Sequence, residues 1–384
     1  MPTPLEDARD VRNDLRAWLL DYAYPLWWEA GTDHERGGFF EKIDQTGLAT
    51  QAPRRARVQP RQIYAFAVAS GLGWNGPAKE AVEQGLDFYL KHYRRSDGLM
   101  RALVDANGEA LDDSVALYDQ AFALFGLATA YKMLGGGDLK AAAVTLRDEL
   151  IATLKHPVAG FEESNPRTLP LQSNPHMHLF EACLAWDEAG GDPEWRVLAD
   201  EIANLALTKF IDADSGAIRE FFDGDWDPAP GVEGRIAEPG HQFEWAWLLL
   251  RWSRLTGRRD AQDAALRMIA IGEGPGVDRQ RGVAINQLLT DMSVHDPVAR
   301  LWPQTERIKA GALSAEITGD DTGWTLAADA GRGLLKYFET PVRGLWWDRY
   351  NPDGSFTNEP APASSFYHIV CAIHELDRAI DAAT

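Results

Sequence analysis

Six polar or aromatic side chains recur along the chain at a nearly constant spacing, and their types suit chemistry on a polar small molecule. Successive members are separated by 57, 60, 63, 61 and 66 residues: Arg61, Tyr118, His178, His241, Trp302 and His368. The three imidazoles can transfer protons near neutral pH, the guanidinium can stabilise a developing negative charge, and the two aromatic rings can stack on a ligand. This combination is typical of a site that binds a sugar.

Two of the histidines have a carboxylate on the same face of the predicted helix. Glu244 follows His241 by three residues, and Glu181 follows His178 by three. Side chains at this spacing are neighbours on a helix. A carboxylate so placed can hold one imidazole nitrogen and raise its basicity, so we predict Glu244 as the partner of His241. A lone histidine near a helix start is usually solvated or a capping residue, but three at equivalent positions favour a function.

The aromatic and amide residues of this set are predicted to bind the substrate. Gln304 and Glu306 follow Trp302 at the start of one helix, and Tyr118 occupies the equivalent position in another repeat. Packing in the core is the alternative interpretation for Tyr118 and Trp302. The polar neighbours of Trp302 favour a place at the rim of a binding site.

Apolar residues recur with helical spacing in about twelve segments, separated by Pro and Gly residues. The predicted helices cover residues 5–28, 60–73, 77–94, 114–134, 138–154, 175–190, 193–209, 240–257, 259–271, 297–318, 322–339 and 363–381. No convincing long strand occurs. The protein is therefore predicted to be all-α.

The loops between alternate helices repeat as well. Each contains a unit led by a glycine, and successive glycines are separated by 60, 62, 56, 66 and 62 residues: Gly38, Gly98, Gly160, Gly216, Gly282 and Gly344. The residues after each glycine partly alternate between apolar and polar, which predicts a turn that leads into a small hairpin. A fixed period of this length is typical of repeat architectures.

Six copies of a helix pair can stack as an open solenoid or close into a ring. Closure buries both terminal repeats, and neither end of this chain resembles a polar cap. We therefore predict an (α/α)6 barrel, with short β-hairpins in the long loops at one end, as a single domain over residues 1–384. The inner helices of that barrel all begin at the hairpin end, so the recurring side chains should meet around the axis.

Composition and motifs exclude several partners. The formal net charge is −20 and the sequence pI is about 4.8, which opposes binding to nucleic acids and anionic membranes. No bilayer-length apolar run and no secretory signal pattern occurs, so a cytoplasmic protein is expected. Cys183 and Cys371 lie in apolar helical segments and are expected to be buried free thiols. The expected partner is a small monosaccharide, and a homodimer is left open.

Cofactor motifs are missing from the sequence. It has no HExxH motif, no zinc-type spacing of Cys and His, no GxGxxG and no Walker loop. Neither a metal nor a nucleotide cofactor is expected. A sugar phosphate is less expected without a phosphate-binding loop, although the arginines near Arg57 could bind an anionic sugar.

Several segments together resemble the N-acylglucosamine 2-epimerase superfamily, which includes cellobiose 2-epimerases, mannose isomerases and sulfoquinovose/mannose aldose–ketose isomerases. The resemblance covers essentially the whole chain and rests on PRQIYAFAVA, LYDQAFALFGLA, NPHMHLFEACLAW, PGHQFEWAWLLLRW, RLWPQTERIKA and SSFYHIVCAIHEL. It implies an (α/α)6 barrel that acts on reducing sugars without a metal or redox cofactor. GHQFEW and LWPQTER are similar to the mannose-isomerase branch.

The resemblance also implies residue roles. It places five residues at catalytic and substrate-binding positions: Arg61, His178, His241, Glu244 and His368. Among them, His241 and His368 are implied to form the proton-transfer pair. Trp302, Gln304 and Glu306 fall in the substrate-contacting helix.

The hypothesis that follows is interconversion of D-mannose and D-fructose through a cis-enediol, with D-lyxose and D-xylulose as a related pair. Reprotonation of C2 from the opposite face would instead make the protein a sugar 2-epimerase. A more distant alternative is an (α/α)6 glycoside hydrolase, which would need two facing carboxylates such as Glu244 and Glu306. A non-catalytic sugar-binding protein is the third alternative.

Overall fold

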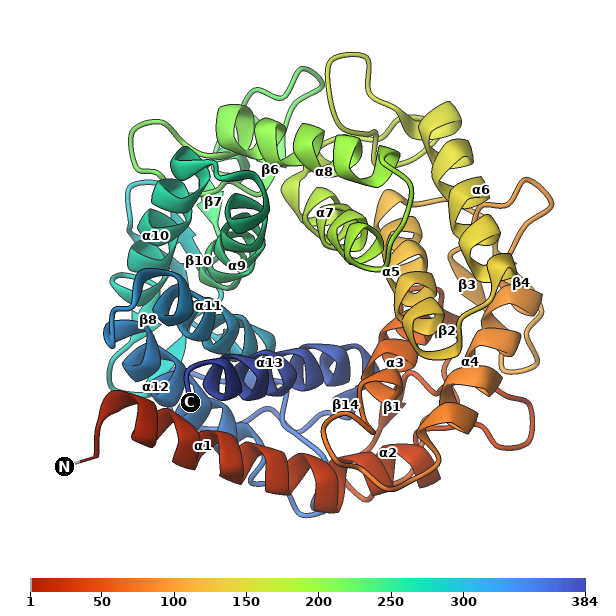
Figure 1. Cartoon of the computed structure of the whole chain (residues 1–384), viewed down its shortest axis with the longest axis horizontal. Coiled ribbons are helices and arrows are strands. Elements are labelled where there is room, and N and C mark those ends of the chain that lie inside the picture. The colour runs from red at the N-terminus through yellow and green to blue at the C-terminus, as the bar shows by residue number, and fades with distance from the viewer. Residues whose placement is uncertain (1) are drawn as a thin grey trace.

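The helices form two concentric rings in the computed structural model, which describes residues 2–384 (Figure 1). The inner ring contains α3 (Val58–Ala67), α5 (Leu117–Leu134), α7 (Ser173–Glu188), α9 (Pro239–Thr256), α11 (Trp302–Thr318) and α13 (Ala363–Ala382). The outer ring contains α1 (Pro4–Trp18), α2 (Tyr24–Glu29), α4 (Ala78–His92), α6 (Gly137–Leu154), α8 (Glu194–Leu205), α10 (Arg259–Glu273) and α12 (Thr322–Tyr337). A π-helical turn, Leu19–Ala23, joins α1 to α2 as one continuous helix. The predicted (α/α)6 architecture is confirmed.

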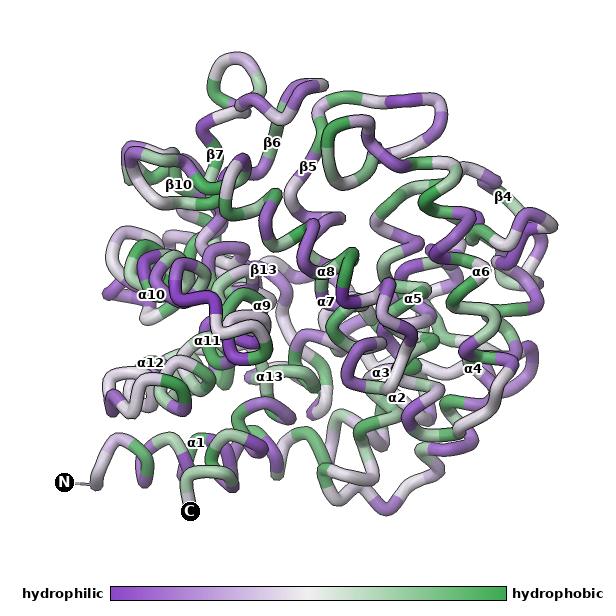
Figure 2. Tube along the Cα trace, turned by 45° about the horizontal axis from the view of Figure 1, so that its top comes forward, coloured by the Kyte–Doolittle hydropathy of each residue, from purple (hydrophilic) through white to green (hydrophobic). Residues whose placement is uncertain are grey.

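Burial separates the two rings. Almost every residue of α9 from Pro239 to Ser253 is buried, because this helix packs on outer helix α10 on one side and on the axis on the other. The outer helix α1 buries one stripe, Ala8, Val11 and Leu15, and alternates between hydrophilic and hydrophobic residues along its length (Figure 2). A helix that is apolar all round must lie inside the protein, whereas an amphipathic one covers the surface.

The six glycine-led turns are confirmed. Every one of these glycines has a positive φ, between 70° and 95°, which is the left-handed region that favours glycine. In five repeats the turn closes an antiparallel bridge, as between Thr32 and Phe39 or between Arg94 and Met100. These hairpins are short: four are closed by a single bridge, and the fifth pairs two residues on each side.

Short strands also join neighbouring loops, and these pairings hold the mouth of the barrel together. The pairs are β2 (Arg54–Arg55) with β3 (Leu103–Val104), β5 (Leu171–Gln172) with β6 (Phe221–Phe222), β7 (Ile236–Ala237) with β10 (Gln287–Leu289), β12 (Ala299–Arg300) with β13 (Arg349–Tyr350), and β1 (Lys42–Ile43) with β14 (Ala361–Pro362). A single bridge, Ala116 to Ser164, joins the second long loop to the third. The other strands are β4 (Ala110–Asp112), β8 (Val277–Asp278), β9 (Val283–Ala284) and β11 (Val294–Asp296). All the pairings are antiparallel, and those between neighbouring loops run around the starts of the inner helices.

Two helices differ most from the prediction. The helix expected over 297–318 begins only at Trp302, because Ala299 and Arg300 pair with β13 instead. The helix expected over 60–73 runs from Val58 to Ala67. Cys183 and Cys371 are buried free thiols, as expected. Among residues 2–384, no helix is long and apolar enough to cross a membrane.

Candidate active site

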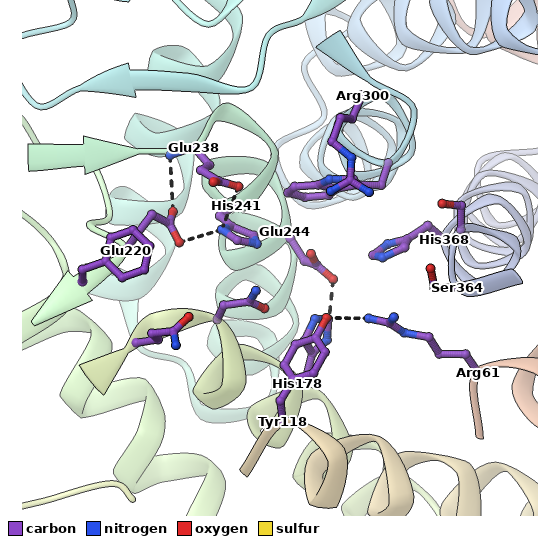
Figure 3. Close-up of a pocket in the computed structure, with 15 residues that line it drawn as sticks. Arg61, Tyr118, His178, Glu220, Glu238, His241, Glu244, Arg300, Ser364 and His368 are labelled. Atoms are coloured by element: carbon purple, nitrogen blue, oxygen red, sulfur yellow. Dashed lines mark hydrogen bonds and ion pairs between the residues drawn. The ribbon is translucent and has the colours of Figure 1, made fainter. Parts of the chain in front are cut away.

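The inner helix starts surround a cavity of about 300 Å³ at the axis (Figure 3). All six recurring residues line it, together with Glu244: Arg61, Tyr118, His178, His241, Trp302 and His368. The ring of Trp302 is close to two of the three imidazoles. Its centroid lies 4.9 Å from that of His241 and 5.8 Å from that of His368. Helices from different repeats therefore bring together residues that are far apart in the sequence.

His241 is held by carboxylates of the preceding loops. Its Nδ1 lies 2.8 Å from Oε2 of Glu220 and 3.6 Å from Oε2 of Glu238. Burial opposes the charged imidazole, but these two carboxylates outweigh it and raise the pKa of His241 to about 10. His241 is therefore an imidazolium at neutral pH, and it donates from Nδ1 to Glu220.

The prediction that Glu244 holds His241 is wrong. Helical side chains lean toward the N-terminus of their helix, so His241 meets the loop before α9 while Glu244 points one turn deeper. The Glu244 carboxyl lies 4.0 Å from Nδ1 of His178 and 3.9 Å from Nζ of Lys309. Within residues 2–384 neither of its oxygens has a hydrogen-bond partner, although the residue is buried. Burial, together with nearby Glu306, raises the pKa of Glu244 well above its ordinary value.

His368 faces the same cavity from the opposite wall (Figure 3). Its Nδ1 lies 2.8 Å from Oε1 of Glu306, a buried residue on the neighbouring α11. Burial lowers the pKa of His368 well below its ordinary value, and the cations of Arg61 and Lys309 lower it further. The ring is therefore neutral. An ionised Glu306 can only accept a hydrogen bond, so Nδ1 would then carry the proton and the unprotonated Nε2 would be the atom left to face the cavity.

His178 and Arg61 lie on the remaining wall. Nδ1 of His178 is 3.4 Å from Glu181, as its helical spacing suggested, and burial lowers the pKa of His178 to about 3 despite that carboxylate. Glu181 also accepts a hydrogen bond from the hydroxyl of Tyr367. The guanidinium of Arg61 donates to the hydroxyl of Tyr118 at 2.6 Å. Arg61 is 5% exposed, so its charge is directed into the cavity rather than into solvent.

The prediction that Gln304 contacts the substrate is corrected. Its amide accepts from the N–H of Ala284 at 2.8 Å and donates to the carbonyl of the same residue at 2.9 Å. Gln59 holds Phe39 in the same way, and Gln120 and Gln242 hold Met100 and Ile218. Gln304 is thus one of a repeating set of helix-start amides that fasten the hairpin loops. It does not line the cavity.

Glu306 also lies outside the cavity, in a buried layer of charge beneath it. Its Oε2 is 2.6 Å from Nζ of Lys309, which is fully buried and lies 3.9 Å from the ring centroid of Trp247. Its predicted substrate contact is therefore corrected to a contact with His368.

Two groups of side chains here have metal-ligand chemistry, His178–Glu181–Glu244 and Glu244–Glu306–His368, with ligand atoms within 4.8 Å of one another. The ammonium of Lys309 already places a positive charge between these carboxylates.

Several cavity residues escaped the sequence analysis. Glu220 and Glu238 come from loops and strand ends, and Ser364 from the first turn of α13. Arg300 precedes Trp302 by two residues and projects over the cavity, with Nε 3.1 Å from Asp348 (Figure 3). Glu220 lies four residues after Gly216 in a repeating glycine-led unit, and Arg300 begins the segment RLWPQTER that carries the family resemblance. Their direction could not be inferred there.

Comparisons with known proteins agree on one family. The model for N-acylglucosamine 2-epimerase (GlcNAc 2-epimerase) matches residues 38–372. A protein named mannose-6-phosphate isomerase, from Rhizobium meliloti (strain 1021), is 51% identical over 371 residues, covering 95% of this chain and 96% of its own. A D-mannose isomerase from Thermobifida fusca is 28% identical over 390 residues, covering 91% and 90%. The structure of a cellobiose 2-epimerase from Spirochaeta thermophila DSM 6192 superposes with a TM-score of 0.87 at 22% identity, covering 98% of each chain.

Proposed function

Because the chain belongs to the N-acylglucosamine 2-epimerase family of sugar isomerases and epimerases, we propose that it interconverts a mannose-type aldose and the corresponding ketose. One observation carries the proposal: two histidines whose pKa values are shifted in opposite directions, His241 upward and His368 downward, face each other across one cavity. Opposite protonation states at the same pH are what a general base and a general acid need. The relative with 51% identity is named an isomerase, which favours the ketose over the 2-epimer.

In the proposed reaction, His368 takes the C2 proton of the open-chain aldose on its unprotonated Nε2. Electrons from the C–H bond form the C1–C2 double bond, and the carbonyl oxygen O1 takes a proton from His241. The product of this step is a cis-enediol. His241 then removes the proton of the O2 hydroxyl while His368 returns its proton to C1, which yields the ketose and restores both histidines.

Arg61 and Glu244 are proposed to act on the sugar oxygens. The guanidinium of Arg61 would stabilise negative charge on O1 or O2 in the enediol-forming transition state. Glu244, with a raised pKa and two free oxygens, would donate a hydrogen bond as a neutral carboxylic acid. Tyr118, His178 and Trp302 would position the sugar, the first two by hydrogen bonds and the last by its ring.

A proton-transfer assay in heavy water tests the function. The protein is incubated with D-mannose and with D-mannose 6-phosphate, and products are identified by NMR. We expect the wild-type protein to form the ketose with deuterium at C1. In His368→Asn the rate of ketose formation should fall by at least about 100-fold. His374→Asn, on the same helix but at the opposite end of the barrel, is the matched control and should stay active. Accumulation of glucose would favour the 2-epimerase, and absence of both conversion and exchange would refute the proposal for these sugars.

A phosphorylated aldose is a second candidate substrate. The relative with 51% identity carries mannose 6-phosphate in its name, and the cavity contains two guanidiniums, Arg61 and Arg300. The start of α13, with Ser364 and Ser365, adds the N-terminus of a 20-residue helix. If the phosphate binds there, Arg300→Gln should reduce kcat/KM for both sugars unequally. The loss for the phosphorylated sugar should exceed the loss for mannose by a factor of about 10 or more. Arg349→Gln, outside the cavity, is the control, and an equal loss for both sugars would argue against phosphate binding by Arg300.

A further inference from the structure

One lysine, Lys309, is completely buried at the barrel axis and lies outside the cavity wall. It belongs to α11, two turns below the mouth, and its Nζ is 2.6 Å from Glu306 and 3.9 Å from Glu244. The ring of Trp247 covers it at 3.9 Å. A buried ammonium is costly unless charges pair with it, so a lysine here needs a reason beyond filling space.

Apart from the ring of Trp247, the groups that act on Lys309 are acidic. Ionisable groups act on its ammonium from its own helix and from three other inner helices: Glu306 on α11, Glu244 on α9, Glu181 on α7 and Cys371 on α13. Lys309 is the cation among three buried carboxyl groups. Burial raises the pKa of Glu306, and Lys309 opposes that rise more than any other group. The ammonium therefore favours the ionised form of Glu306.

A continuous contact leads from this ammonium to the cavity. Lys309 Nζ pairs with Oε2 of Glu306, and Oε1 of the same carboxylate lies 2.8 Å from Nδ1 of His368. A carboxylate at Nδ1 accepts a hydrogen bond and keeps the proton there, whereas a carboxylic acid would offer a proton instead. The protonation of Glu306 therefore decides which nitrogen of His368 is free.

We propose that Lys309 is a positioning residue for the proton transfer: its ammonium keeps Glu306 ionised, and Glu306 holds His368 with the basic nitrogen toward the substrate. The proposal rests on the role of His368 in the proposed function. The other titratable or charged groups near His368 are Arg61, Glu181, Arg300, Glu244 and His178.

The test compares kcat/KM against pH for wild type, Lys309→Met and Lys309→Arg. Without the ammonium, Glu306 is more readily protonated, so the pair Glu306–His368 holds one proton more than in wild type. That extra proton must leave before Nε2 of His368 can accept a proton from the substrate. In the profile of kcat/KM against pH, the acidic limb of Lys309→Met should move to higher pH by about one unit or more. At neutral pH this variant should therefore be about 10-fold or more less active than wild type, and the difference should diminish as pH rises. Lys309→Arg should restore the wild-type limb. Lys132→Met, which removes a half-exposed lysine at the opposite mouth, is the matched control.

Two further measurements make the outcome decisive. The double variant Glu306→Gln/Lys309→Met removes both charges and should fold even if Lys309→Met does not. Its profile of kcat/KM against pH should have the same acidic limb as that of Glu306→Gln alone. Nitrogen-15 NMR of the ligand-free protein should show His368 protonated at Nδ1 in wild type and altered in Lys309→Met, whatever the substrate proves to be. A loss of activity that is uniform across pH, with an unchanged His368 spectrum, would overturn the proposal. A changed spectrum in a protein without isomerase activity would leave it standing and refute the proposed function instead.

Discussion

His241 and His368 have the same side chain, the same 2.8 Å contact between Nδ1 and a glutamate, and a view of the same cavity, yet their pKa values shift in opposite directions. The difference lies in what surrounds each glutamate. Glu220 and a second carboxylate, Glu238, both act on His241. The negative charge of Glu306 is shared with Lys309, so little of it is left to stabilise a charged His368. Burial, together with the cations of Arg61 and Lys309, therefore makes His368 a base where His241 is an acid.

The first prediction concerns the pH dependence of wild-type turnover. His368 acts when neutral, so activity should be lost only as pH falls through its lowered pKa, below the ordinary histidine value. His241 acts when protonated, so activity should be lost as pH rises through its pKa of about 10. A plot of kcat/KM against pH should show a plateau from neutral to mildly alkaline pH. An alkaline limb near the ordinary histidine pKa would contradict this assignment.

The second prediction concerns Glu220→Gln. The amide can still bind Nδ1 of His241, but the negative charge that raises the pKa of His241 is removed. The alkaline limb of kcat/KM should shift down by about 1–2 pH units, while the acidic limb stays in place. Glu238→Gln should give a smaller shift, because that carboxylate is 3.6 Å away instead of 2.8 Å. Equal movement of both limbs would show that the variant disturbs the site generally.

At the scale of the helix, the starts of α3, α5, α9 and α11 each perform two tasks with residues one or two positions apart. One side chain faces the axis, and another turns back to fasten the hairpin loop, as Trp302 and Gln304 do on α11. The same division holds for Arg61 and Gln59 on α3. Both kinds of residue recur with the period of the repeat, so spacing alone does not separate a cavity residue from a structural one. Side-chain direction does, and it depends on the loop packed above.

The third prediction concerns the close approach of α9 and α11. A Cβ on Gly240 would lie 2.4 Å from the ring of Trp302, so Gly240→Ala must displace that ring from between the two histidines. We expect kcat/KM to fall by about 10- to 100-fold with a smaller change in thermal stability. Gly137→Ala, where an added Cβ meets nothing within 4 Å, is the control and should behave like wild type. Unchanged kinetics in Gly240→Ala would mean that the position of Trp302 does not matter.

At the scale of the whole molecule, the ring closes by contacts between the first and last repeats. Inner helix α13 packs on α3, outer helix α12 packs on α1, and strand β14 pairs with β1 (Figure 1). Closure gives every inner helix two inner neighbours, which is what holds six helix starts around one point. The cavity therefore depends on the complete ring, because its residues come from all six repeats.

The fourth prediction tests that closure. Asp377 of α13 binds two arginines of α1, Arg12 at 2.6 Å and Arg16 at 3.2 Å, and Asp377→Ala leaves Arg12 partly buried without this carboxylate. We expect unfolding stability to fall by about 1–3 kcal/mol while unfolding stays a single transition. Asp329→Ala, from an ion pair with Arg332 in which both side chains are about half exposed, should cost about 0–1 kcal/mol. Thermal denaturation measures both, and two separate transitions would show that the repeats unfold independently.

Much of the fold and part of the site were predictable because they follow from local rules. Glycines in left-handed turns, amphipathic outer helices and the near-constant spacing of the helix starts are written into consecutive residues, and closure then brings the recurring positions together. The pair His178–Glu181 was predictable for the same reason, since one helical turn joins them.

The charge state of the site was decided only by tertiary structure. Glu220 reaches His241 from 21 residues away, and Glu306 reaches His368 from 62 residues away, in each case from another element. Electrostatic interactions act through space and depend on burial, so a pKa follows from neighbours that the chain order does not reveal. The sequence alone determined that the six recurring side chains meet at the axis. The packing of neighbouring repeats decided which histidine holds a proton there, because it placed two carboxylates beside His241 and a lysine behind the partner of His368.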